Sequence, residues 1–207
     1  MTDATKDCMT ELIFLRHTQV KVDKGICYGQ ADVPLADTYS NELRVIKEQL
    51  TTLTIAATYT SPLTRCYQLA GDLESIVKQQ PIQIPEFMEL DFGHWELKNW
   101  DQNDDPLLST WYDNYLIQPA TGGESWADLC VRVQTMCQYL ISKHLGETIL
   151  IVTHAGVIRA AQVLFQGVNP KAAFAQQIPY GSLQHIHIDQ TGTTKRKQDP
   201  ILKSIND

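Results

Sequence analysis

Short apolar runs recur along the chain and are separated by segments with helical periodicity. Residues 11–15, 54–60 and 148–153 are runs of this kind, each followed at once by polar residues. Such runs are typical of strands that are buried on both faces. Residues 81–85 lie between two prolines and predict an edge strand. Alternating residues over 183–188 predict a last strand.

Apolar residues at helical spacing fill the intervals between these strands. A stripe over residues 43–53 predicts one helix. Ser61 followed by Pro62 predicts the start of another, with Ser61 as the N-cap and Pro62 at the first helical position. Ser125, with Asp128 three residues later, is typical of a capping box that opens a third helix.

Strands that alternate with helices define the expected fold class. A further helix near 156–166 follows the run at 148–153. We therefore expect a single three-layer α/β/α domain over residues 1–207, with a mostly parallel central sheet. Residues 1–10 and 191–207 are expected to be flexible tails. Residues 86–123 hold three of the four tryptophans and are expected to form a helical insertion that acts as a lid.

The composition of the chain argues against several classes of binding partner. The net charge is -7, whereas nucleic-acid binders are usually basic, and the one basic run, at 195–197, is expected to be a solvated tail. The five cysteines include no Cys-x-x-Cys pair, which argues against a zinc ribbon or a disulfide framework. No apolar run approaches the length of a membrane span. We expect a cytoplasmic protein without nucleic-acid or membrane partners, and homodimerisation stays open.

Charged and nucleophilic residues follow three of the predicted strands directly. Arg16 and His17 follow the first strand, Arg65 lies in the first turn after the second, and His154 follows the run at 148–153. Ligands of open parallel sheets bind at the carboxyl ends of the strands. These four residues are therefore expected to converge on one pocket.

This combination of residues suits a phosphate ester. Arginine offers a planar fork of donors that matches phosphate oxygens. A neutral imidazole is a competent nucleophile toward phosphorus, and a second histidine can stabilise charge on the transferring group. The leaving alkoxide needs a proton, which predicts a carboxylic acid nearby.

Four segments resemble, in the same order, the signature blocks of the histidine phosphatase superfamily, also called phosphoglycerate-mutase-like. They are residues 15–18 (Leu-Arg-His-Thr), 60–70 (Thr-Ser-Pro-Leu-Thr-Arg-Cys-Tyr-Gln-Leu-Ala), 89–96 (Glu-Leu-Asp-Phe-Gly-His-Trp-Glu) and 152–156 (Val-Thr-His-Ala-Gly). The resemblance spans residues 11–160 and implies the phosphoglycerate-mutase-like fold.

The resemblance implies a role for each matching residue. His17 would become phosphohistidine, and Arg16, Arg65 and His154 would bind the phosphoryl group. Glu89 would act as general acid and then as base for the attacking water. The substrate would be a small phosphomonoester, and neither a metal nor a cofactor would be needed.

Departures from the superfamily pattern point to a subgroup. Thr18 stands where glycine is usual. Asp23 falls near the position of a phosphate-binding asparagine, but a carboxylate would repel phosphate, so we assign Asp23 no role in the site. Residues 25–36 resemble a run of the α-ribazole phosphatases, which dephosphorylate a precursor of the cobalamin nucleotide loop. In this run Tyr28 and Gly29 are expected to contact the substrate.

Several alternatives stay open at this point. The enzyme could instead be a broad-specificity sugar-phosphate phosphatase or a phosphoglycerate mutase of the same superfamily. A catalytically silent module that binds phosphorylated ligands is a third reading. His94 is either a surface residue or a substrate contact. His185 and His187 share one strand face, but no third metal ligand is evident, so no metal site is expected.

Overall fold

The computed structural model describes residues 9–189 of the chain. The basic run at 195–197 and the expected tails lie outside these residues, except for Met9 and Thr10, and Thr10 already belongs to the first strand. No helix in the described part is long and apolar enough to cross a membrane.

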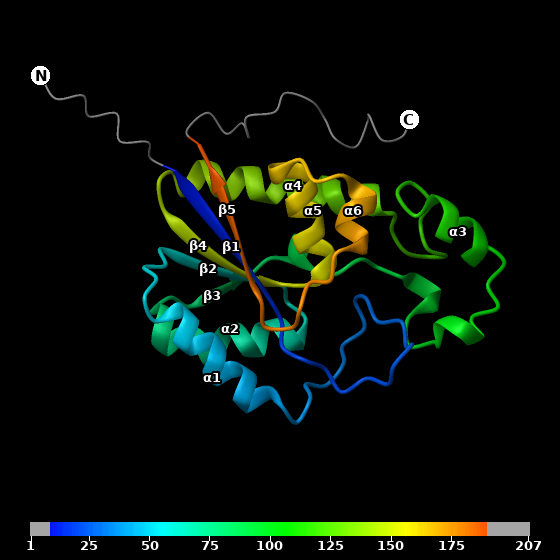
Figure 1. Ribbon diagram of the computed structural model, residues 1–207, viewed down its shortest axis with the longest axis horizontal. Coiled ribbons are helices and arrows are strands. Elements are labelled where there is room, and N and C mark those ends of the chain that lie inside the picture. The colour runs from blue at the N-terminus through cyan, green and yellow to red at the C-terminus, as the bar shows by residue number, and fades with distance from the viewer. Residues whose placement is uncertain (1–8, 190–207) are drawn as a thin grey trace, which may run out of the picture.

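Five strands form one sheet in the order β3-β2-β4-β1-β5. β5 runs antiparallel to β1, and the other neighbouring strands are parallel. This confirms the expected mostly parallel sheet, with β3 at one edge as predicted (Figure 1). The strands are β1 (Thr10–Arg16), β2 (Ala57–Thr60), β3 (Pro81–Gln83), β4 (Thr148–Thr153) and β5 (Leu183–Ile188).

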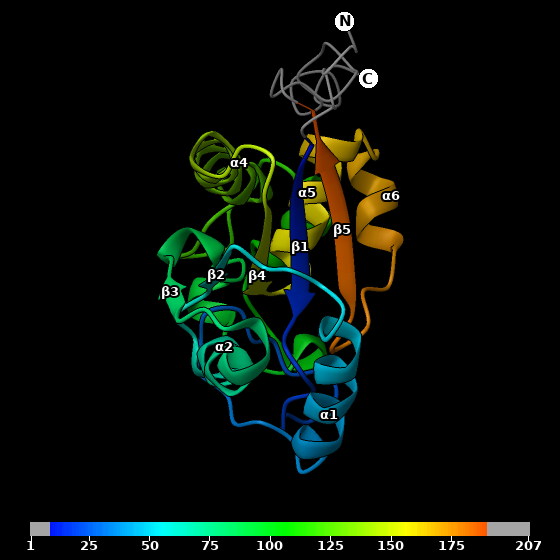
Figure 2. The same cartoon turned by 90° about the vertical axis from the view of Figure 1, so that its left-hand side faces the viewer.

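Helices cover both faces of the sheet and so make the predicted three layers. α1 and α2 lie on one face, and α4, α5 and α6 lie on the other (Figures 1 and 2). The helices are α1 (Tyr39–Leu50), α2 (Thr64–Val77), α3 (Leu108–Asn114), α4 (Trp126–Lys143), α5 (Ala155–Gln166) and α6 (Pro170–Ala175).

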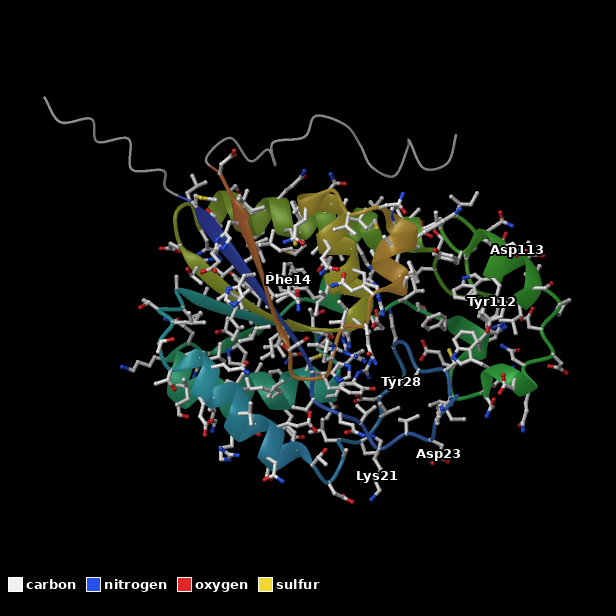
Figure 3. All side chains as sticks on the ribbon, in the orientation of Figure 1. Phe14, Lys21, Asp23, Tyr28, Tyr112 and Asp113 are labelled. Atoms are coloured by element: carbon white, nitrogen blue, oxygen red, sulfur yellow. The ribbon has the colours of Figure 1, made fainter. Side chains whose placement is uncertain are left out.

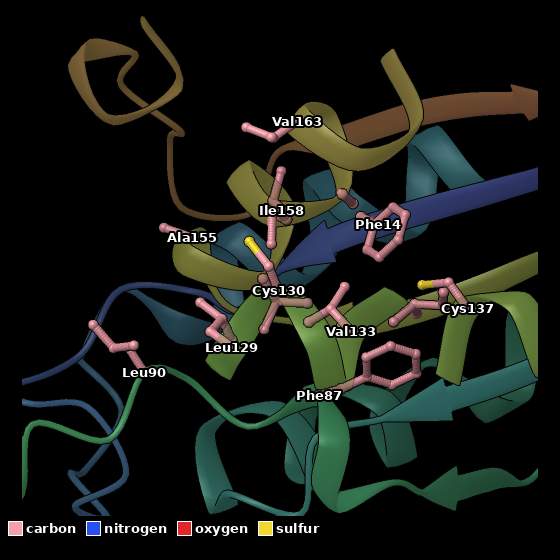
Figure 4. Close-up of a cluster of buried hydrophobic side chains, with 14 of the residues drawn as sticks. Phe14, Phe87, Leu90, Leu129, Cys130, Val133, Cys137, Ala155, Ile158 and Val163 are labelled. Carbon is pink, nitrogen blue, oxygen red and sulfur yellow. The ribbon is translucent and has the colours of Figure 1, made fainter. Parts of the chain in front are cut away.

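Burial on both faces explains the continuous apolar runs of the central strands. Successive residues of a strand point to opposite faces. Leu12 and Phe14 accordingly pack into the cluster beneath α4 and α5, while Ile13 and Leu15 pack beneath α1 and α2. Phe14 lies among residues from α4 and α5 in Figure 4. Cys137 belongs to the same cluster, as core filler.

The start of α4 has the geometry that its sequence predicts. The Ser125 hydroxyl accepts a hydrogen bond from the Asp128 N–H at 3.2 Å, and the Asp128 carboxylate accepts one from the Ser125 N–H at 2.9 Å. This reciprocal arrangement confirms the capping box.

The predicted start of α2 was wrong by a few residues. Ser61 is not the N-cap, because the helix begins at Thr64 after an extended Leu63. The Thr64 N–H donates instead to the carboxylate of Asp32, at 2.9 Å. The Ser61 hydroxyl is within 2.8 Å of a ring nitrogen of His154. The carboxylate of Asp32, which is distant in sequence, thus caps the helix, and the Ser61 hydroxyl contacts His154 instead.

The segment 86–123 is less helical than expected. It contains α3 and short 3-10 turns, η1 (Pro85–Phe87), η2 (Gly93–Trp95) and η3 (Trp100–Gln102). Its tryptophans pack on one another, with ring centroids of Trp95 and Trp111 5.5 Å apart. Figure 3 shows Tyr112 and Asp113 on α3, away from the sheet. Lid movement stays a prediction.

Candidate active site

The order of the strands brings the predicted residues together. Arg16, the last residue of β1, pairs with Thr153 of β4, and Thr60 of β2 pairs with Val152. Each of these strands is followed directly by a site residue, namely His17 after β1, Ser61 after β2 and His154 after β4. They therefore meet at the carboxyl edge of the sheet, as the strand pattern predicts.

The His17 ring is neutral and has one defined tautomer. Its side chain is almost fully buried, and its Nδ1 lies 2.7 Å from the Thr18 carbonyl oxygen. A carbonyl can only accept, so Nδ1 carries the proton and Nε2 keeps its lone pair. His17 lines a cavity of about 250 Å³.

His154 lies against His17 rather than on the cavity wall. The two ring centroids are 5.2 Å apart, and His154 is fully buried. Nε2 of His154 is 2.8 Å from the Ser61 hydroxyl and 3.5 Å from the Cys66 sulfur. The residues that line the cavity do not include His154, so its predicted contact with a phosphoryl group stays a prediction.

Arg65 is a fully buried cation that is held by carbonyl groups. Nη1 donates to the Ala31 carbonyl at 2.9 Å, and Nη2 donates to the Gly29 carbonyl at 2.5 Å. No carboxylate of the described residues forms an ion pair with it. A guanidinium in this position favours an anion in the cavity, which Arg65 lines. Gly29 itself is not a lining residue.

Arg16 reaches the cavity beneath a pair of tyrosines. Its guanidinium carbon lies 3.8 Å from the ring centroid of Tyr180, and Nη1 donates to the Ile178 carbonyl. The hydroxyl groups of Tyr28 and Tyr180 are 2.7 Å apart. Tyr28 lines the cavity and lies near the carboxyl ends of the strands in Figure 3.

The sequence motifs do not point to Tyr180, yet a signal exists. Residues 178–182 precede β5, which is antiparallel to β1. The amino end of an antiparallel strand lies at the same sheet edge as the carboxyl ends of the parallel strands. Assigning the last strand an antiparallel direction from the sequence would therefore have placed the loop at 178–182 at the site.

Glu89 supplies the carboxyl group of the cavity. Oε1 accepts a hydrogen bond from the Leu90 N–H at 3.0 Å, and Oε2 accepts one from the Gly156 N–H at 3.1 Å. Gly156 lies in the first turn of α5, directly against the carboxyl group. A Cβ at this position would come within 2.1 Å of Oε1, so only glycine leaves room for Glu89.

Burial and neighbouring cations keep both histidines neutral. Burial is the main cause that lowers the pKa of His17 well below its ordinary value, and Arg65 and Arg16 lower it further. The Thr18 carbonyl acts in the opposite direction. Burial also lowers the pKa of His154, with Arg65 as the next cause. A neutral His17 is the protonation state that a nucleophile needs.

The rest of the cavity lining is mainly apolar and aromatic, with one further cation and one amide side chain. Arg159 holds the end of α6 through hydrogen bonds from Nε to the Ala173 carbonyl, at 3.0 Å, and from Nη2 to the Gln176 carbonyl, at 3.1 Å. Arg159 lies four residues after the lining residue Ala155, a helical spacing that could have identified it from sequence. The other side chains of this lining are Leu90, Phe92, Trp126, Phe174, Gln177 and Ile178.

Other residues that the sequence left open lie outside the cavity lining. Asp23 and His94 are exposed. His185 bonds to Glu11 at 2.8 Å, and His187 lies 3.8 Å from the same carboxylate. Within residues 9–189, no group of three or more His, Cys, Asp or Glu side chains is arranged to hold a metal ion.

A neutral, oriented histidine beside two arginines, a second histidine and a carboxyl group is an arrangement that suits phosphoryl transfer. Comparison with known families agrees with this class. The family model described as "Histidine phosphatase superfamily (branch 1)" matches residues 12–199. The chain belongs to this superfamily.

Relatives within the superfamily differ in their substrates. Phosphoserine phosphatase 1 of Hydrogenobacter thermophilus is 22% identical over 190 residues, which are 88% of either chain. The adenosylcobalamin/alpha-ribazole phosphatase of Escherichia coli is 27% identical over 191 residues, 89% of this chain and 93% of the relative. Phosphoglycerate mutases also match, at 25% identity.

Solved structures confirm the fold. Bacillus stearothermophilus YhfR superposes with a TM-score of 0.79 over 92% of this chain and 96% of that chain, at 24% identity. At this level of identity the similarity shows the fold alone.

We predict that Gly156→Ala lowers kcat for an alkyl phosphate by about ten- to a hundredfold, because Glu89 must move by about an ångström. The matched control is Gly71→Ala in α2, where an added Cβ meets nothing within 4 Å. Gly71→Ala should leave kcat unchanged and raise the free energy of unfolding by about 0.5–1 kcal/mol. An unchanged kcat in Gly156→Ala would contradict the placement of Glu89.

We predict that His17 and His154 stay neutral as the pH falls through 6.5, the ordinary value for histidine. The unfolded chain binds these protons first, so both groups lower the free energy of unfolding as the pH falls below that value. Ring resonances followed by NMR and assigned with His17→Asn and His154→Asn should show no transition near pH 6.5. A transition of His17 at that pH would refute the prediction.

Proposed function

We propose that the protein is a metal-independent phosphomonoesterase that acts through a phosphohistidine at His17. One observation carries this proposal: the Thr18 carbonyl fixes the proton on Nδ1, and Nε2 is left as the nucleophile beside Arg16 and Arg65. These arginines supply the positive charge that the phosphoryl oxygens require. The proposed reaction therefore does not use a metal ion.

In the first step the lone pair of His17 Nε2 attacks phosphorus. The bond between phosphorus and the ester oxygen breaks, and that oxygen takes the proton of the Glu89 carboxylic acid. The alcohol leaves, Glu89 becomes a carboxylate, and the phosphoryl group is bonded to Nε2. Nδ1 of His17 keeps its proton throughout and donates it in the hydrogen bond to the Thr18 carbonyl.

In the second step water attacks the phosphorus of phosphohistidine. The Glu89 carboxylate takes a proton from this water, and the electrons of the N–P bond return to Nε2. Inorganic phosphate leaves, and His17 and Glu89 regain their initial states. The sum is hydrolysis of one monoester by one water molecule.

We propose α-ribazole 5′-phosphate as the substrate, because the aromatic part of the cavity lining suits an aromatic leaving alcohol. Phe92 and Phe174 are partly exposed aromatic rings in the cavity lining, and the nearly buried Trp126 also lines it. The Escherichia coli relative supports this choice. The run at 25–36 carries less weight, because Gly29 and Asp32 in it have structural roles beside Arg65 and at the start of α2.

Phosphoserine is a second candidate, and Arg159 is the observation that favours it. Arg159 is a cation in the cavity lining, without an ion-pair partner among the described residues. A carboxylate on the leaving alcohol would pair with it. The Hydrogenobacter thermophilus relative carries a phosphoserine phosphatase name.

We predict that His17→Ala abolishes turnover of 4-nitrophenyl phosphate, since the nucleophile is lost. His94→Ala removes an exposed histidine outside the cavity lining and should leave turnover unchanged. A chelator should not change the rate of the wild-type enzyme. Undiminished turnover by His17→Ala would contradict the mechanism. Ligand binding by the wild type without any turnover would favour the silent binding module.

We predict that the wild type prefers α-ribazole 5′-phosphate over phosphoserine, phosphoglycerates and sugar phosphates in kcat/KM. Arg159→Met should lower kcat/KM by about tenfold or more for substrates with a carboxylate, through loss of a charge-assisted hydrogen bond, and much less for the others. A preference for phosphoserine that disappears in Arg159→Met would establish the second candidate. Similar kcat/KM values for all of these substrates would identify a broad-specificity phosphatase.

A further inference from the structure

Glu89 lies in backbone that has no regular secondary structure of its own. It follows η1 and precedes η2, and no helix or strand spans residues 88–92. Backbone groups in such a segment lack the regular hydrogen bonds of a helix or strand and depend on other partners. Other side chains must therefore fix the position from which the Glu89 carboxyl group enters the cavity.

Arg132 of α4 bonds this segment at three points. Its Nη1 donates to the carbonyl of Glu86 at 2.6 Å and to that of Met88 at 2.7 Å. Its Nη2 donates to the carbonyl of Glu89 itself at 3.0 Å. The arginine side chain is 19% exposed, so these bonds are largely shielded from water. One side chain thus holds three of four successive carbonyl groups up to the catalytic residue.

Glu124 completes this arrangement from the loop before α4. Its carboxylate oxygens accept from Arg132 Nε at 3.0 Å and from Arg132 Nη2 at 2.5 Å. One of these oxygens also accepts from the Asp91 N–H at 3.0 Å. All five N–H donors of the guanidinium group then have an acceptor, which leaves its plane little freedom.

We propose that Arg132 and Glu124 are positioning residues that hold Glu89 in the geometry needed to protonate the leaving oxygen. This inference rests on the proposed role of Glu89 as the general acid. Neither residue lines the cavity, so neither touches the substrate. Lysine cannot replace Arg132, because a single ammonium group cannot bond three carbonyls and a bidentate carboxylate in one plane.

The test compares two substrates that differ in their need for a proton. An alkyl phosphate releases a basic alkoxide and depends on the general acid, whereas 4-nitrophenolate leaves as a stable anion. We expect Arg132→Met to lower kcat at least about tenfold more for the alkyl phosphate than for 4-nitrophenyl phosphate, within the range that acid catalysis supplies. Competitive inhibition by inorganic phosphate should stay unchanged.

Two further variants calibrate this comparison. Glu89→Gln should show the same selectivity for the alkyl phosphate, to a greater degree. Arg44→Met removes an exposed arginine that pairs with Glu48 on α1, far from the site, and should change neither rate. Glu124→Gln retains the Arg132 side chain but removes one of the two carboxylate acceptors that orient its guanidinium group, and it should lose the alkyl phosphate reaction selectively. It serves as the test if Arg132→Met does not fold.

The outcomes separate this inference from the proposed function. Selective loss in Glu89→Gln together with equal losses on both substrates in Arg132→Met and Glu124→Gln would overturn the positioning role alone. These residues would then support only the fold. Equal losses on both substrates in Glu89→Gln would overturn the general acid, and the positioning role with it.

Discussion

The buried guanidinium of Arg65 is the constraint on which the site depends. A cation without a carboxylate partner is unfavourable in the interior unless other groups compensate for its lost hydration. Here carbonyls of the loop at 29–31 solvate it, and it lies at the cavity wall. Its charge helps to keep His17 and His154 neutral. One residue therefore prepares both the binding of an anion and the reactivity of the nucleophile.

Most of the site is built from irregular backbone that charged side chains fix in place. The Glu96 carboxylate accepts from the Gln30 N–H at 2.7 Å and from the Phe92 N–H at 3.1 Å, and so joins the loop around Arg65 to the segment after Glu89. Arg132 performs the corresponding task on the other side of Glu89. The sheet provides the histidines with rigid strand ends, while these carboxylate and guanidinium groups order the loops. Hydrogen bonds from charged side chains to backbone groups therefore fix the positions of the loops around the site.

The fold and the convergence of the site followed from local pattern. Apolar runs ending at His17 and His154 predict buried parallel strands, and parallel strands bring their carboxyl ends to one edge. The strand ends at Arg16 and Thr153 pair directly, which confirms this reasoning.

What the sequence did not predict depends on contacts between distant segments. Ser61 looked like a helix cap, but Asp32, from a separate loop, occupies that role. Arg159 reaches the cavity, and Tyr180 reaches Arg16 and Tyr28, from the last third of the chain, where no strand-end motif marks them. In the sequence, Arg132 is an ordinary polar residue of an amphipathic helix. Its role becomes visible only when the structure places the segment before Glu89 against it. Hydrogen bonds of this kind have no fixed sequence spacing.

The central claim is that Nε2 of His17 attacks phosphorus between Arg16, Arg65 and His154. A crystal structure with orthovanadate, which adopts the geometry of the transferring phosphoryl group, tests it most directly. We expect a bond between vanadium and His17 Nε2, equatorial oxygens bonded to the two arginines and to His154, and an apical oxygen near Glu89. Vanadate that is bonded to another residue, or that lies away from His17, would contradict the account.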